Sequence, residues 1–109
     1  MELKRVVVTG LGAITPLGNT VESYWDGLVK GKSAAGPITR FDATNFKTKF
    51  ACEVKDFNAE EYLDRKEVRK TDLFAQYAIA AAEQAFQDSG LDLEKIDLDE
   101  AGVIWGAGI

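Results

Sequence analysis

Histidine is absent from this chain of 109 residues, and cysteine occurs only once, at Cys52. The lack of histidine removes the commonest metal ligand and the commonest general base, so we expect neither a metal site nor a complete catalytic site here. A single cysteine cannot form an internal disulfide, which favours a reducing compartment. No apolar run approaches the length of a membrane span. These absences predict a cytoplasmic protein without a membrane segment.

Broad positive charge is also missing. The formal net charge is −5, which argues against nucleic-acid binding, because nucleic-acid-binding proteins normally carry a wide basic face. Apolar residues make up 46% of the chain and charged residues 28%, as in a single globular domain. Against this acidic background, RKEVRK at residues 65–70 holds four of the thirteen basic residues. This window is either a binding surface or a solvated helix end with local pairs, such as Glu61 with Arg65.

Two apolar segments predict strands of a parallel sheet. Arg5–Thr9 is a β-branched run that ends at glycines, and GVIWGAGI at residues 102–109 is a second buried run. Strand, helix and strand in this order form a right-handed crossover, so the predicted fold class is α/β. The last strand ends at Ile109 without a turn or polar exit. We therefore expect residues 1–109 to be the incomplete front portion of a larger α/β protein. The alternative is a small domain whose final strand happens to be C-terminal.

Periodic apolar residues predict two helices. The first follows Asn19, which can form a capping box with Glu22, and it closes at Gly31. The second covers residues 71–89 and stops at Gly90. Its apolar stripe comprises Phe74, Tyr77, Ala78, Ala81 and Ala85.

Between these helices the sequence predicts less regular structure. Residues 33–48 are expected to form an irregular connection. Lys49–Val54 alternates in polarity and predicts a short, half-buried strand. The covered face of that strand would hold Phe50, Cys52 and Val54. Asn58 with Glu61 could cap a further short helix.

Two motifs invite a chemical interpretation, and neither meets the requirements of its chemistry. TGLGAITPLG follows a predicted strand as a dinucleotide-binding loop would, but Thr15 stands where the third glycine belongs. Cys52 has no histidine to activate it and has Glu53 as its neighbour, so we expect a buried, inert thiol.

Five segments carry a family resemblance because they occur in a specific order and spacing: RVVVTGLGAITPLGN, RFDATNF, KFACEVKDFN, DRKEVRKTDLFAQYAIAAAEQAFQDSGL and GVIWGAGI. Together they resemble the β-ketoacyl-acyl carrier protein synthases, above all the type II, chain-elongating condensing enzymes of bacterial fatty acid synthesis. The resemblance runs from Arg5 to Ile109 and corresponds to the N-terminal portion of such an enzyme.

The resemblance implies a thiolase-like fold, in which two similar α/β halves form α-β-α-β-α layers, usually in a homodimer. In this family a cysteine takes an acyl chain from acyl carrier protein. Two histidines then assist the decarboxylation of malonyl-carrier protein and the formation of the carbon–carbon bond. All three residues lie downstream of this stretch in the family pattern, so residues 1–109 alone are expected to be inactive. No cofactor is implied, since the substrates travel on the phosphopantetheine arm of the carrier protein.

The resemblance also implies a role for the basic window. Acyl carrier proteins are strongly acidic, and condensing enzymes receive them on a basic patch beside the active-site tunnel. Lys66, Arg69 and Lys70 match that patch, and Arg65 is carried over as its neighbour. At helical spacing one face could present the first three.

One further residue is carried over from the family pattern. Ile109 matches the residue of a G-x-G-I stretch that lines the acyl pocket and limits chain length; the alternative is an ordinary strand isoleucine. A different function also stays open for the whole chain, that of a non-catalytic or polyketide-type relative such as a chain-length factor or ketosynthase. The residues after Ile109 would distinguish these functions, since active enzymes carry the cysteine and both histidines there.

Overall fold

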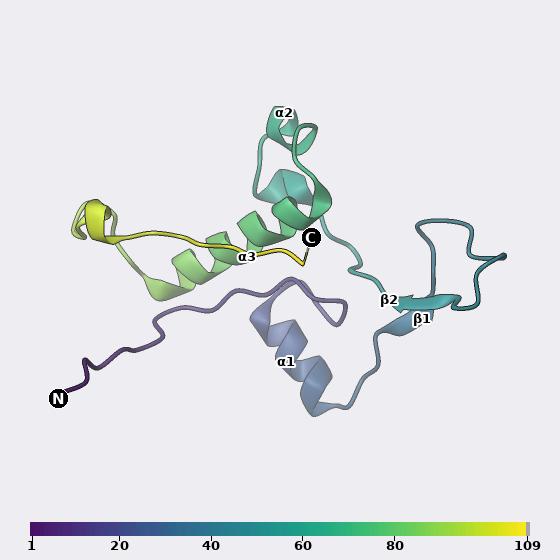
Figure 1. Cartoon of the computed structure of the whole chain (residues 1–109), viewed down its shortest axis with the longest axis horizontal. Helices are drawn as coiled ribbons and strands as arrows, with labels where there is room; N and C mark the ends of the chain where they lie inside the picture. Colours follow the sequence, from purple (N-terminus) through teal and green to yellow (C-terminus); the bar gives the residue numbers. More distant parts are fainter. Residues whose placement is uncertain (109) are drawn as a thin grey trace. The chain divides into compact units, whose positions relative to one another are not determined.

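The computed structural model describes residues 1–108, which form two compact units. One unit combines residues 1–12 with residues 59–108, and the other comprises Ala13–Asn58. Figure 1 shows their helices and strands. Ile109, the predicted acyl-pocket residue, lies outside the described residues.

The longest element of the first unit is helix α3, Leu73–Ser89. It begins two residues after the predicted start, and it ends as predicted at Gly90, whose φ of 66° is the left-handed conformation that glycine adopts without strain. Its buried residues are Gln76, Ala80 and Ala81. The predicted stripe is therefore only partly correct, because Phe74 is exposed and a polar residue is buried instead.

The N-terminal segment packs closely against α3. The Leu11 backbone N–H donates to Asp88 Oδ2 at 2.9 Å. A Cβ on Gly10 would lie 2.1 Å from the Ala85 carbonyl oxygen, and a Cβ on Gly12 would lie 2.0 Å from that of Ala81. Both glycines are thus required because the two backbones approach each other too closely for any side chain.

The two predicted parallel strands are not formed in the described part of the chain. Residues 5–9 and 102–108 are irregular chain segments that pair with no strand (Figure 1). Val6 is 88% exposed and Ile104 is 99% exposed, so the expected burial is wrong as well. The physical reason is that a strand needs a neighbour to pair its backbone N–H and C=O groups, and none of the described residues provides one.

Short elements complete the first unit. The 3-10 helix η1, Ala59–Glu61, confirms the short helical turn predicted near Asn58. Helix α2, Arg65–Val68, follows it and leads into α3. A second 3-10 turn, η2 at Leu98–Glu100, lies in the acidic connection after α3.

The second unit contains helix α1, Val21–Val29. The predicted capping box exists one residue further on, at Thr20. The Thr20 hydroxyl oxygen accepts the Ser23 backbone N–H, and the Ser23 hydroxyl oxygen accepts the Thr20 backbone N–H. Asn19, the predicted cap, instead donates its side-chain amide to the Lys55 carbonyl at 2.7 Å. Asn19 therefore bonds to a residue far along the chain and does not cap α1.

The same unit holds the only sheet among residues 1–108, and it is antiparallel. Strand β1, Ala35–Pro37, pairs with strand β2, Phe50–Cys52, in the register Gly36 opposite Ala51. β2 confirms the predicted short strand, but its predicted covered face is wrong except at Val54, which follows the strand and is half-buried. Phe50 is 65% exposed and Cys52 is exposed, whereas Ala51 between them is half-buried. A two-stranded sheet leaves one face open, and these side chains lie on it.

No helix formed by residues 1–108 combines the length and apolarity required to cross a membrane.

Candidate functional site

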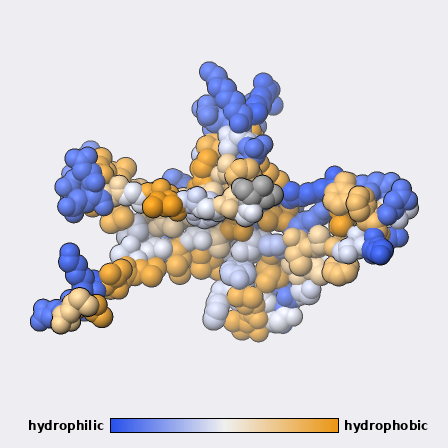
Figure 2. All heavy atoms as spheres, viewed as in Figure 1, coloured by the Kyte–Doolittle hydropathy of each residue, from blue (hydrophilic) through white to orange (hydrophobic). Residues whose placement is uncertain are grey.

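The four cations of residues 65–70, here called the basic segment, are all exposed. Arg65 and Lys66 belong to α2, which is only four residues long. Arg69 follows as its C-cap, with helical φ and ψ of −69° and −21°, and the Lys70 N–H donates to the Glu67 carbonyl at 3.1 Å. The prediction assumed helical spacing from Lys66 to Lys70, but the helix ends at Val68. Residues 69 and 70 continue as a hydrogen-bonded turn. Figure 2 shows hydrophilic atoms gathered at the tip where Figure 1 places α2.

One member of the segment has a local acidic partner. Arg65 Nε lies 3.6 Å from Glu60 Oε1. The predicted partner was Glu61, and this prediction is wrong, because the local pair forms with Glu60 instead. Both side chains are more than half exposed, and such pairs contribute about 0–1 kcal/mol. Lys66, Arg69 and Lys70 form no ion pair with any residue from 1 to 108.

The segment is held in place from both ends. At its start, the Asp64 carboxylate accepts the Glu67 backbone N–H at 2.9 Å, which caps α2. At its end, the Thr71 hydroxyl donates to the Glu67 carbonyl. Val68, between the exposed cations, is half-buried.

A buried polar side chain reaches the same region from α3. Gln76 is 8% exposed, and its Nε2 donates to the Val68 carbonyl at 3.1 Å and to the Thr71 carbonyl at 2.8 Å. Sequence patterning did not single out this residue. The available signal was weak, namely one amide side chain inside the otherwise apolar run FAQYAIAAA.

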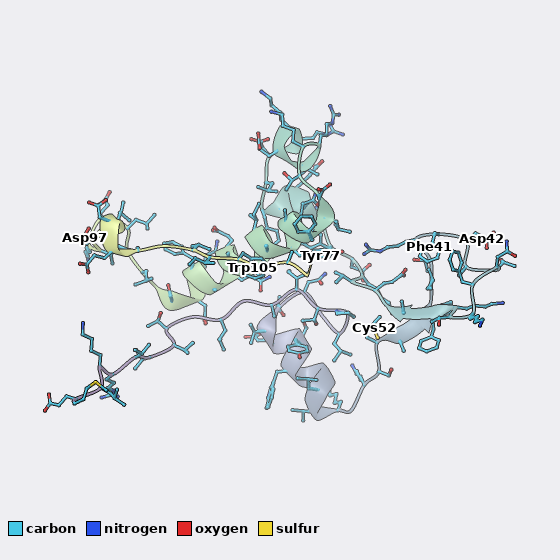
Figure 3. All side chains as sticks on the ribbon, in the orientation of Figure 1. Phe41, Asp42, Cys52, Tyr77, Asp97 and Trp105 are labelled. Carbon is cyan, nitrogen blue, oxygen red and sulfur yellow. The ribbon has the colours of Figure 1, made fainter. Side chains whose placement is uncertain are left out.

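An apolar pocket of about 420 Å³ lies elsewhere in the same unit. It is bordered by α3, by Thr9 and Gly10 from the N-terminal segment, and by residues 102–105. Trp105 borders it and is 59% exposed (labelled in Figure 3). The pocket carries no acid–base pair, so it can accommodate an apolar group but offers no chemistry of its own.

Cys52 is a free, exposed thiol on β2 (Figure 3), which corrects the prediction that it is buried. Exposure alone does not make it a nucleophile, because an activating base is needed and the chain has no histidine. Nor do His, Cys, Asp or Glu side chains gather into a metal-binding group of three or more within residues 1–108. Among residues 1–108, the feature that stands out is therefore the exposed cationic surface of the basic segment.

Comparison with known proteins identifies the family of the chain. The family model of the beta-ketoacyl synthase N-terminal domain matches residues 3–109. The chain belongs to this family. The resemblance read from the sequence is thereby confirmed.

Curated relatives in this family agree closely with the chain. It is 52% identical over 109 residues to 3-oxoacyl-[acyl-carrier-protein] synthase 2 of Synechocystis sp.. It is 50% identical over 109 residues to the protein of the same name from Coxiella burnetii. Each alignment covers 100% of this chain and 26% of the relative, so the chain spans about a quarter of the length of these synthases.

Two solved structures share the fold of this family member. One is the ishigamide ketosynthase/chain length factor, with a TM-score of 0.75 and 41% identity over 83% of this chain and 22% of the other. The second is a type II PKS acyl-carrier protein in complex with its ketosynthase bound to the hexaketide. Its TM-score is 0.61, with 33% identity over 84% of this chain and 23% of the other. The chain is thus a mixed α/β structure that matches part of these ketosynthases.

Proposed function

We propose that this chain is the N-terminal portion of a chain-elongating 3-oxoacyl-[acyl-carrier-protein] synthase and that its basic segment receives acyl carrier protein. The observation that carries the proposal is the set of three exposed cations, Lys66, Arg69 and Lys70, that lack ionic partners among residues 1–108 of a chain with net charge −5. The ketosynthase relative solved with its acyl-carrier protein supports it by likeness.

In the full-length enzyme, the reaction would begin when an acyl chain passes from the carrier protein to a cysteine thiol. Malonyl-carrier protein would then lose carbon dioxide, and its carbanion would attack the acyl thioester to extend the chain and release the thiol. The cysteine and its two histidine helpers belong to the part of the enzyme beyond this chain. Residues 1–109 would supply scaffold, docking surface and, at Ile109, a wall of the acyl pocket, and would be inactive alone.

The physical role of the docking surface is electrostatic steering. Exposed cations that are not neutralised locally attract an acidic partner over distances up to the Debye length, about 8–10 Å at physiological ionic strength. Such complementarity raises the rate of encounter and fixes orientation more than it raises affinity. Arg65, which already contacts Glu60, would contribute least.

The proposed assembly also accounts for the unpaired segments. Residues 5–9 and 102–108 are apolar, exposed and without strand partners. In a thiolase-like, layered α/β enzyme, the remaining three quarters of the protein would supply neighbouring strands and covering helices. We place this full-length enzyme in the cytoplasm as a homodimer.

The test is triple charge reversal, Lys66→Glu with Arg69→Glu and Lys70→Glu, in the full-length enzyme at low salt. Each exposed charge is worth about 0.2–1 kcal/mol, so single reversals should raise the KM for carrier-bound substrate by less than about fivefold, and the triple reversal by much more. The thermal midpoint should stay nearly unchanged. If the triple variant has unchanged kinetics with carrier-bound substrate, the docking proposal is wrong. The basic segment would then be only a solvated helix end.

A second candidate function is favoured by the ketosynthase/chain length factor, at a TM-score of 0.75. In this alternative the chain belongs to a polyketide-type relative, and a chain-length factor would lack the nucleophile. Incubating the full-length protein with acyl carrier protein that bears a radiolabelled acyl chain separates an acyl-accepting synthase from a chain-length factor. Covalent labelling indicates an acyl-accepting cysteine, whereas a chain-length factor would remain unlabelled.

A further inference from the structure

Helix α2 is too short to hold its own conformation. It has four residues, and isolated helices below about 12 residues are marginal in water because nucleation is costly. The Asp64 cap secures its first turn. The last carbonyls of any helix have no partner within the helix and need one from outside. A segment that must present three cations together therefore requires an anchor at its C-terminal end.

Gln76 supplies that anchor from a different helix. Its side-chain amide has two N–H groups, and they donate to the carbonyl of Val68, which ends α2, and to that of Thr71, which follows the basic segment. Gln76 itself belongs to the first turns of the 17-residue α3, where its backbone N–H donates to the Asp72 carbonyl at 3.0 Å. One buried side chain thus connects the exit of the basic segment to the longest helix of the unit.

The cations lie away from the carbonyls that Gln76 binds. The carbonyls that Gln76 binds lie on the protected side of the segment, where Val68 is half-buried, while the cationic residues are exposed. Figure 3 shows nitrogen-tipped side chains extending outward from the α2 ribbon. A surface whose backbone is fixed before binding loses less conformational freedom on association.

We propose that Gln76 is a positioning residue that fixes the basic segment on α3, so that Lys66, Arg69 and Lys70 meet an acidic partner as one pre-formed surface. This inference rests on the proposed docking function. Gln76 does not touch the partner and acts only through the segment that it holds.

The experiment uses the full-length enzyme with Gln76→Met, which keeps the length and volume of the side chain but removes both donors. The matched control is Gln84→Met on the same helix. Gln84 donates to the Tyr62 hydroxyl at 3.0 Å, so this variant also removes a part-buried hydrogen bond, but one formed with a residue before α2. Should Gln76→Met fail to fold, Gln76→Asn keeps a polar amide and withdraws it by one methylene from the two carbonyls.

Two readouts decide the proposal. Amide hydrogen exchange over residues 65–71 should accelerate about tenfold in Gln76→Met, because two hydrogen bonds to that backbone are lost, and should stay unchanged in Gln84→Met. The KM for acyl-carrier protein substrate should rise roughly three- to tenfold while kcat is retained, because encounter is impaired and chemistry is not. Added to a neutral triple variant, Lys66→Gln with Arg69→Gln and Lys70→Gln, Gln76→Met should raise KM no further, since no charges then remain to be positioned.

The outcomes separate this inference from the docking proposal. If the triple charge reversal raises KM and Gln76→Met does not, docking stands and the positioning role of Gln76 is overturned. The positioning role is also overturned if Gln84→Met raises KM equally, or if Gln76→Met lowers kcat with KM unchanged. If the triple reversal itself leaves KM unchanged, the docking proposal fails, and the exchange rates still show whether Gln76 fixes the segment.

Discussion

Thr39 donates two hydrogen bonds to the carboxylate of Glu53, one from its backbone N–H at 3.1 Å and one from its hydroxyl at 2.7 Å. Thr39 follows β1 and Glu53 follows β2, and in the antiparallel register these positions lie beyond opposite ends of the ladder. The bonds therefore connect the segment that leaves one strand to the segment that leaves the other. The hydroxyl bond is the main cause that lowers the pKa of Glu53 below its ordinary value of 4.5, and the backbone bond adds to it.

The lowered pKa predicts how the hairpin responds to acid. A carboxyl group whose pKa is lower in the folded state contributes stability that is fully present above its ordinary pKa and is lost as pH falls through the folded value. Thr39→Val removes the hydroxyl and keeps the backbone N–H, so the pKa of Glu53 should rise toward 4.5. An NMR titration of the Glu53 side-chain carboxyl carbon measures this. Identical titration curves for wild type and variant would show that the hydroxyl is not the cause.

The contact between the N-terminal segment and α3 yields a second prediction. Gly12→Ala would place a Cβ 2.0 Å from a helix carbonyl oxygen, so the backbone must shift, and overpacking of this kind costs about 1–3 kcal/mol. The free energy of unfolding of the full-length protein, from denaturant titration, should fall accordingly. Gly36→Ala is the control, because within residues 1–108 no atom beyond its chain neighbours lies within 4 Å of its Cβ position. Equal stability of Gly12→Ala and wild type would contradict the close approach.

Local structure was predictable where local residues decide it. Gly90 ends α3 as expected because a left-handed residue after a long helix favours glycine in any context. β1 could not be foreseen, since Gly36 and Pro37 disfavour a strand and only pairing with Phe50–Cys52 creates one. Whether residues 5–9 form a strand depends in the same way on a pairing partner elsewhere in the chain, and among residues 1–108 they have none.

The candidate site also has one part that local sequence predicts and one part that depends on distant partners. The charges of the basic segment are visible in the sequence, whereas its anchor is not. Gln76 acts on Val68 and Thr71 through backbone carbonyls, and those partners leave no trace in side-chain identity. The pairing of Arg65 with Glu60 instead of Glu61 likewise follows from the 3-10 turn at η1, which helical spacing does not describe.

Ile109 carries a prediction that depends on the proposed function. If its side chain lines the acyl pocket, Ile109→Phe in the full-length enzyme should block long acyl primers and spare short ones. A bulkier side chain in a packed site typically costs about 1–3 kcal/mol, roughly a five- to 150-fold loss for primers that reach it. Measuring kcat/KM against a series of acyl lengths tests this. A uniform loss at every length would indicate misfolding, and Ile109 would then be an ordinary structural residue.

Asp64 separates the conformation of the basic segment from its charge. Its carboxylate caps α2 and also places a negative charge next to Arg65. Asp64→Asn keeps an equally good cap and removes the charge, whereas Asp64→Ala removes both and costs about 0.5–2 kcal/mol locally. Amide exchange over residues 65–70 should therefore accelerate in Asp64→Ala and stay unchanged in Asp64→Asn.

The same pair of variants tests electrostatic steering by the proposed docking surface. Because Asp64→Asn makes the surface more positive without loosening it, the KM for acyl-carrier protein substrate should fall at low salt. The difference from wild type should vanish near about 0.5 M salt, where charges separated by more than a few ångströms are screened. Asp64→Ala should gain charge and lose order, so its KM should exceed that of Asp64→Asn at every salt concentration. A KM that rises in Asp64→Asn would mean that the carboxylate itself contacts the partner, and steering by net positive charge would then be the wrong account of this surface.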